Sequence, residues 1–181
     1  MNITDLLFDK GNSNAISEFA NNFGVNDSQA KDAISSLAKS LSRGLGQNTQ
    51  DERGMGGLFD ALNSGNHSRY LDDPSLLGRK ETTNAGNDIL GHIFGNKDVS
   101  RYVTKRASKD TGLSGTLLKK MLPVVASMVM GALGKKMLGG GSGGRSRQES
   151  TGFLTKIFDR DHDGSMVDDV LGMAFKAFMS R

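Results

Sequence analysis

The fold is decided by residues 121–134, which read Met-Leu-Pro-Val-Val-Ala-Ser-Met-Val-Met-Gly-Ala-Leu-Gly. Nearly every position is apolar or small, so a helix formed by this segment has no polar face to present to water. The run is 14 residues long and is followed by Lys135 and Lys136, whereas a membrane-spanning helix needs about 20 apolar residues. We therefore expect a buried core helix and no membrane span.

Pro123 lies about three turns into the helical segment 114–138. Proline removes one backbone hydrogen bond and clashes with the preceding turn, which costs ~3 kcal/mol unless the helix bends. The sequence therefore predicts either a kink at Pro123 or a new helix that begins with Pro123 in its first turn.

The surrounding segments also follow a helical period. No window alternates apolar and polar residues for long enough to indicate a strand, so the predicted fold class is all-α. Ser13, either Asp27 or Ser28, and Ser114 are the expected N-caps. Helices are expected at residues 16–23, 30–41, 54–63, 89–94 (after a Gly/Asn-rich turn), 99–111 and 114–138.

An internal repeat suggests how these helices are arranged. Residues 24–45 align without gaps onto residues 112–133, and each copy holds a Gly stop, an apolar residue and a polar cap before a long helix. This pattern predicts a helical bundle built from two similar helical hairpins. Ser35 occupies the position of Pro123 in the first copy, so the first long helix is expected to be straight.

Several of these motifs resemble the YidB-like family of bacterial proteins of unknown function. The resemblance is carried by Phe23-Gly24-Val25, by Thr111-Gly112-Leu113, by Leu118–Pro123, and by the segments 62–67 and 89–95. It covers about residues 1–138. It implies an all-α fold with an uncharacterised activity, and it transfers no catalytic residue to this chain.

Composition excludes some kinds of chemistry and favours others. The chain of 181 residues has no Cys, which excludes disulfides, thiolate nucleophiles and zinc ribbons. Its net charge of +3 is unevenly distributed, because residues 101–147 hold ten basic residues against Asp110 alone. Such a block attracts anions or simply forms solvated helix faces. The first nine residues lack the features of a signal peptide, so a cytoplasmic location is expected.

The chain is predicted to divide into three parts. Residues 1–138 form the YidB-like all-α domain, and residues 139–150 are a Gly/Ser-rich linker that spans about 17–21 Å. Residues 151–181 are expected to form a tethered helix–loop–helix, because apolar residues at helical spacing flank an Asp-rich loop.

That loop, residues 159–165, reads Asp-Arg-Asp-His-Asp-Gly-Ser and matches the start of an EF-hand. Alternating spacing aims Asp159, Asp161 and Asp163 at one centre, and a carbonyl from Ser165 adds a ligand. Hard oxygen ligands of this kind select Ca²⁺. The sequence therefore predicts a calcium site, and the alternative is an ordinary loop whose Asp residues cap the next helix.

The predicted site departs from the EF-hand pattern at its end. Position 12, normally a bidentate Glu, is Val170, so the closing ligand must come from Asp168, from Asp169 or from water. We favour Asp169 because it is nearer the usual place. A shorter closing ligand predicts weak to moderate affinity, in the micromolar to millimolar range.

The predicted function is that of a non-enzymatic binding or assembly protein. A lone EF-hand lacks its usual pair, so a second chain is one expected partner of Leu171, Phe175 and Phe178, and the main domain is the other. These three apolar residues form a stripe at helical spacing, which is also interpretable as an ordinary part of a hydrophobic core. The G-x-S-x-G match at residues 140–144 lies in the linker with no preceding strand, so no enzyme is predicted.

The alternative function is DNA association through nucleic-acid contacts. The first hairpin has the spacing of a helix-turn-helix, and the basic block around residues 101–120 would contact phosphates. His67 and His92 are expected to be neutral, partly buried or helix-capping residues.

Overall fold

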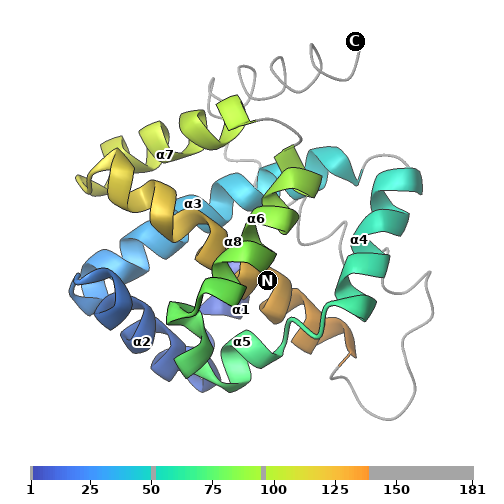
Figure 1. Cartoon of the computed structure of the whole chain (residues 1–181), viewed down its shortest axis with the longest axis horizontal. Helices are drawn as coiled ribbons and strands as arrows, with labels where there is room; N and C mark the ends of the chain where they lie inside the picture. The colour runs from blue at the N-terminus through green and yellow to red at the C-terminus, as the bar shows by residue number, and fades with distance from the viewer. Residues whose placement is uncertain (1, 50–51, 95–96, 139–181) are drawn as a thin grey trace.

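The computed structural model describes residues 2–49, 52–94 and 97–138, which form α- and 3₁₀-helices with no strand among them (Figure 1). The predicted all-α class is confirmed. The longer helices are α2 (Ser13–Phe23), α3 (Asp27–Asn48), α4 (Glu52–Ser64), α6 (Lys80–Phe94), α7 (Lys97–Thr111) and α8 (Gly115–Leu138). The shorter ones are α1 (Ile3–Leu7), α5 (Arg69–Asp72) and the 3₁₀-helices η1 (Lys10–Asn12) and η2 (Pro74–Gly78).

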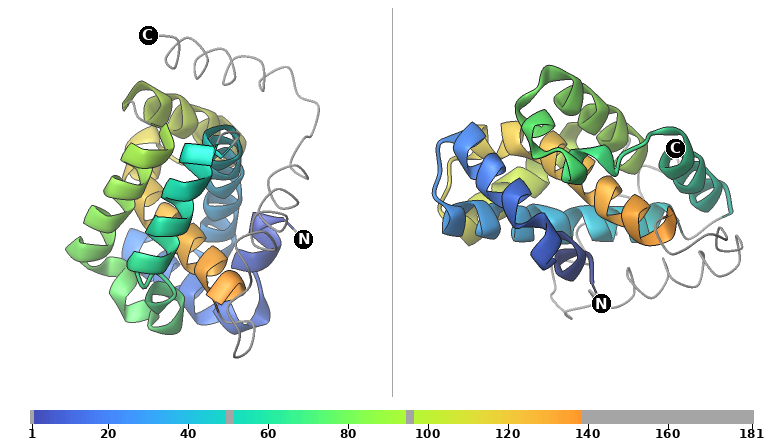
Figure 2. Two further views of the ribbon diagram at one scale, coloured as in Figure 1. Left: turned by 90° about the vertical axis from the view of Figure 1, so that its right-hand side faces the viewer. Right: turned by 90° about the horizontal axis from the view of Figure 1, so that it is seen from below.

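Helix α8 lies at the centre of the described part of the chain, as the sequence predicts. Each of the residues 121–134 is buried, and α8 contacts α1, α3, α4, α5, α6 and α7. Figure 2 shows it passing between the other helices. By length and composition alone α8 could span a membrane, but 83% of its apolar window is buried inside the structure, as is typical of a core helix.

The most extensive contact between helices is that of α6 with α8. Pro123 lies inside α8, so the alternative of a new helix beginning there is wrong. At this crossing, a Cβ added to Gly86 would lie 1.8 Å from the carbonyl oxygen of Pro123. Ser127 Oγ donates a buried hydrogen bond of 3.0 Å to the carbonyl of Thr82. The two backbones can therefore meet only because residue 86 has no side chain.

Helix α6 is longer than the sequence suggests. A Gly/Asn-rich turn was expected before residue 89, but the helix begins at Lys80 and includes Gly86. Thr82 and Gly86 are both buried against the rest of the fold. Tertiary packing therefore overrides the weak intrinsic helix propensity of this segment.

The two turns of the internal repeat share their backbone geometry. Gly24 has φ of 66° and Gly112 has φ of 71°, both in the left-handed region that favours glycine. After the second turn, Ser114 Oγ accepts a hydrogen bond from Leu117 N, so the predicted cap is confirmed. The wider arrangement as two equivalent hairpins stays a prediction.

The other two predicted caps are wrong by one or two residues. Helix α3 is capped by Asn26, whose side chain accepts from Gln29 N at 2.9 Å while the Gln29 side chain accepts from Asn26 N at 3.1 Å. This reciprocal pair satisfies two free amides, which neither Asp27 nor Ser28 achieves. Ser13 is the first residue of α2 itself.

Candidate functional site

The predicted cation loop lies outside the described residues. Its ligands stay a prediction: Asp159, Asp161, Asp163, Ser165 and Asp169. The same holds for the linker 139–150 and for the predicted helix–loop–helix of 151–181. Within residues 2–49, 52–94 and 97–138, no group of three or more His, Asp or Glu side chains is placed to hold a metal ion.

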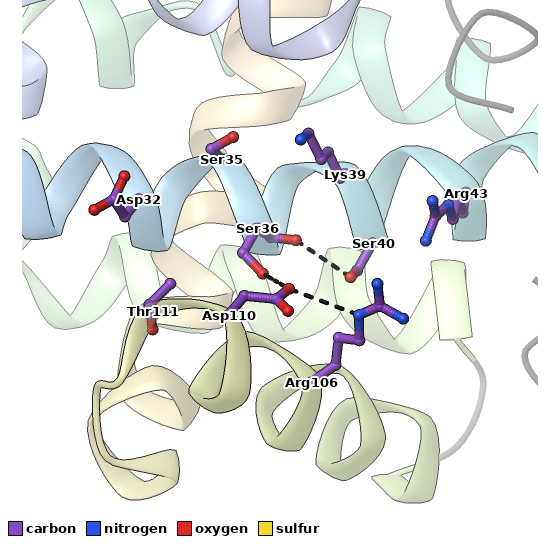
Figure 3. A pocket seen from close by; sticks show the side chains of 9 residues that line it. All are labelled: Asp32, Ser35, Ser36, Lys39, Ser40, Arg43, Arg106, Asp110 and Thr111. Atoms are coloured by element: carbon purple, nitrogen blue, oxygen red, sulfur yellow. Dashed lines mark hydrogen bonds and ion pairs between the residues drawn. The ribbon is translucent and has the colours of Figure 1, made fainter. Parts of the chain in front are cut away.

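One cavity in the described domain is polar. It lies between α3 and α7 and has a volume of about 350 Å³ (Figure 3). We call it the polar groove, and it is lined by Asp32, Ser35, Ser36, Lys39, Ser40, Arg43, Arg106, Asp110 and Thr111.

Asp110 joins the two walls of the polar groove. Ser36 Oγ of α3 donates to Asp110 Oδ2 at 3.0 Å, and Arg106 Nε of α7 lies 3.6 Å from the same oxygen (Figure 3). Ser40 Oγ donates to the carbonyl of Ser36 at 3.2 Å. The acidic residue of the basic block therefore serves as a link between helices.

Most basic side chains of the block around residues 101–120, on which the predicted DNA association depends, are exposed to solvent. The exposed ones on α7 and at the start of α8 are Arg101, Lys105, Lys109, Lys119 and Lys120. Arg101 Nη1 forms an ion pair with Asp98 Oδ1 at 2.8 Å. This exposure fits solvated helix faces as well as an anion-binding surface.

The first helix-turn-helix candidate is a poor fit to a DNA groove. Its second helix, α3, contacts α1, α2, α6, α7 and α8. The exposed residues at its start carry the two carboxylates of Asp27 and Asp32 against the single amine of Lys31. A phosphate backbone would be repelled there more than attracted.

A second cavity is apolar and has a volume of about 580 Å³. It lies between α3, α4, α6 and α8, and we call it the apolar pocket. Its walls are mainly carbon, contributed by Leu45, Leu58, Ala61, Ile89, Ile93 and Met130. Its polar lining residues are Asn48, Thr49, Arg53, Asp60 and His92, and Gly54 and Gly57 complete it.

Helices α3 and α6 are fixed at this pocket by a polar contact. Asn48 Nδ2 donates to the carbonyl of His92 at 2.8 Å, although the His92 side chain itself is exposed. Leu58 on α4 and Ile89 and Ile93 on α6 read as ordinary core positions in the sequence. Nothing in their spacing indicates that their helices leave a cavity between them.

His67 lies between α4 and α5 and is half-buried, as expected for a neutral histidine. Its Nδ1 is buried and has no hydrogen-bond partner. Burial lowers the pKa of His67 and nearby Arg69 lowers it further, while a backbone hydrogen bond with Ala61 acts in the opposite direction. Its backbone carbonyl lies against α8, because a Cβ added to Gly131 would be 2.7 Å from that oxygen.

Comparison with known proteins gives one family. A family model described as a bacterial protein of unknown function, DUF937, matches residues 5–136. The chain therefore belongs to this family, of which YidB is a member, and the resemblance of the main domain is confirmed. The match ends before the Asp-rich loop. No curated protein and no solved structure matches the chain.

Proposed function

We propose that this member of the DUF937 family is a non-enzymatic, cytoplasmic binding or assembly protein whose C-terminal segment takes up calcium. The observation that carries the proposal is the spacing of Asp159, Asp161 and Asp163, followed by Gly164. Three carboxylates at alternate positions repel one another unless a cation lies between them. Gly164 permits the sharp turn that brings a following carbonyl to the ion.

The remaining ligands come from the carbonyl of Ser165 and the side chain of Asp169. An Asp at the closing position is one methylene shorter than the usual Glu and cannot easily bind with both oxygens from there. The site is therefore expected to bind calcium in the micromolar to millimolar range rather than as a tight buffer.

The cavities of the main domain support a binding role. In the polar groove, Ser36 and Arg106 both pair with Asp110, which suits a structural role better than acid–base chemistry. The apolar pocket offers carbon surface with a polar lining, which is typical of sites that bind side chains or small ligands.

Isothermal titration calorimetry on the full chain tests the calcium site. The parent protein should release or absorb heat on titration with Ca²⁺, and Asp159→Ala combined with Asp161→Ala should abolish it. The matched control is Arg160→Ala with His162→Ala, since loop positions 2 and 4 point away from the ion. Equal traces for the two double variants would refute the site.

DNA association is the second candidate, and the exposed amines on α7 and α8 favour it. Duplex affinity should fall by orders of magnitude between low and physiological salt. Lys105→Ala with Lys109→Ala should weaken binding, whereas Arg79→Ala with Lys80→Ala, an exposed basic pair at the start of α6 and outside the basic block, should not. No binding at low salt would exclude this function.

A further inference from the structure

We propose that the apolar pocket is the docking site for the C-terminal helix of this same chain, through Leu171, Ala174, Phe175 and Phe178. Only the calcium dependence of docking rests on the proposed function. The pocket has the composition of a groove that receives the apolar face of a helix, with carbon walls and polar groups beside them. Its volume of about 580 Å³ accommodates more than one large side chain.

The sequence of the tail supplies a matching face. Leu171, Phe175 and Phe178 recur at i, i+4 and i+7, with Ala174 between them on the same side of a helix. The other face carries Lys176, the small Gly172 and Ala177, and one further apolar residue, Met173. A helix whose aromatic residues all lie on one stripe gains stability mainly by packing that stripe against another surface.

The tail can reach the pocket. Met130 of α8 lines the pocket, and α8 ends at Leu138, about 12 Å further along the helix axis. Helix α4, which forms one wall, lies beside this C-terminal part of α8 (Figure 2). The predicted linker 139–150 is expected to span about 17–21 Å, and residues 151–170 add further length before the stripe begins at Leu171.

Tethering selects this occupant over a second copy of the chain. A short flexible linker gives an attached segment an effective concentration in the millimolar range, far above that of a separate molecule in dilute solution. The same stripe from another chain must also overcome the loss of translational freedom on association.

Calcium would control docking through the loop that precedes the stripe. The last predicted ligand, Asp169, is followed directly by Val170 and Leu171. A cation that fixes the loop also fixes the first turn of the following helix, so its apolar stripe is presented in one orientation.

A cysteine-free chain allows a direct test by disulfide formation. Ala174→Cys in the stripe is combined with Gly57→Cys in the pocket, or with Gly91→Cys as the matched control. Both glycines are exposed helical positions where an added Cβ meets nothing within 4 Å. Gly57 lines the pocket, whereas Gly91 does not, although its neighbour His92 does.

We call the two double variants the Gly57 pair (Ala174→Cys with Gly57→Cys) and the Gly91 pair (Ala174→Cys with Gly91→Cys). With calcium and a mild oxidant, the Gly57 pair should form an intramolecular disulfide at least tenfold faster than the Gly91 pair. Non-reducing gels and intact mass distinguish this product from a cross-linked dimer. Adding Phe175→Ser and Phe178→Ser should reduce the rate to that of the control. Equal rates for the two pairs, or a dimer as the main product, overturn the proposal.

Removing calcium separates docking from the proposed function. Faster closure of the Gly57 pair with calcium than with a chelator supports both. Equal, fast closure in both conditions supports docking but refutes its control by calcium. Failure to close in a chain that gives a calorimetric calcium signal overturns docking and leaves the calcium site standing.

Discussion

The contact between α6 and α8 differs in packing and polarity from the contact between α3 and α7. Where α6 crosses α8, Gly86 meets the backbone of Pro123, and Ser127 forms a hydrogen bond inside the core. Where α7 meets α3, Ser36, Arg106 and Asp110 meet across a cavity of about 350 Å³ that is open to solvent. The first contact tolerates no added atom, whereas the second has room for water.

The difference indicates where this fold derives its stability. Closely packed interiors respond strongly to a change of one methyl group, whereas exposed polar pairs contribute little because water competes for them. We therefore expect substitutions of similar chemical size to have unequal effects at the two contacts.

The largest effect is expected at Gly86. Gly86→Ala should lower the free energy of unfolding by about 3 kcal/mol, the upper end of the range for overpacking, because the new Cβ meets backbone that cannot rotate away. Urea denaturation followed by circular dichroism measures the change. Gly91→Ala on the same helix has open space around it and should instead raise stability by about 0.5–1 kcal/mol. Equal effects at the two glycines would contradict close packing at the crossing.

A smaller effect should separate two serines. Ser127→Ala removes a buried hydrogen bond to Thr82, and Ser36→Ala removes an exposed one of the same length, 3.0 Å, to Asp110. Both changes gain the same intrinsic helix propensity, so their difference isolates the effect of burial. Ser127→Ala should be the less stable variant by about 1 kcal/mol in urea denaturation. A difference of the opposite sign would invert the comparison.

A still smaller effect is expected for the ion pair between Asp110 and Arg106. Asp110→Asn should lower the free energy of unfolding by only about 0.5 kcal/mol at low salt, because the carboxylate is partly exposed and water screens its pairing with Arg106. The cost should shrink in about 1 M NaCl, where screening acts within a few ångströms. Thermal melts at the two salt concentrations measure it. A cost that is independent of salt would mean that hydrogen bonding to Ser36, not charge, is the main contribution.

The smallest effect should be a pH dependence of the free energy of unfolding that comes from His67, next to α8. Burial holds the pKa of His67 below its usual value of 6.5, so the unfolded chain binds the proton more readily than the folded one. Its contribution is fully present above pH 6.5 and is lost as the pH falls through the lowered folded pKa. His67→Gln should flatten this part of the stability profile, measured by urea denaturation between pH 7.5 and about 5. A profile unchanged by the substitution would refute the assignment.

Part of this structure could be predicted from the sequence alone. The unbroken run of residues 121–134 has no polar face, so a central helix follows from composition. Similarly, Ala30, Ile34 and Leu41 mark the buried side of α3 by their spacing. These features are local, because a stretch of about 14 residues contains all the information that they need.

The features that sequence could not supply depend on distant partners. Gly86 weakens a helix in isolation, and only its contact with Pro123, far along the chain, explains why it lies inside one. The apolar pocket likewise depends on distant segments, because its lining comes from four helices, α3, α4, α6 and α8. The cap at Asn26 is different, because Gln29 three residues later is a recognisable capping signal in the sequence. The calcium ligands lie outside the described residues and stay predictions.

The central position of α8 has a consequence for biosynthesis. Translation delivers the chain from its N-terminus at about 5–20 residues per second, so residues 1–114 leave the ribosome before the helix that they surround. Until α8 emerges, the apolar faces of the earlier helices have no common surface to cover. We expect the nascent chain to remain loosely associated, exposed to chaperones, and to reach its compact form in one late step.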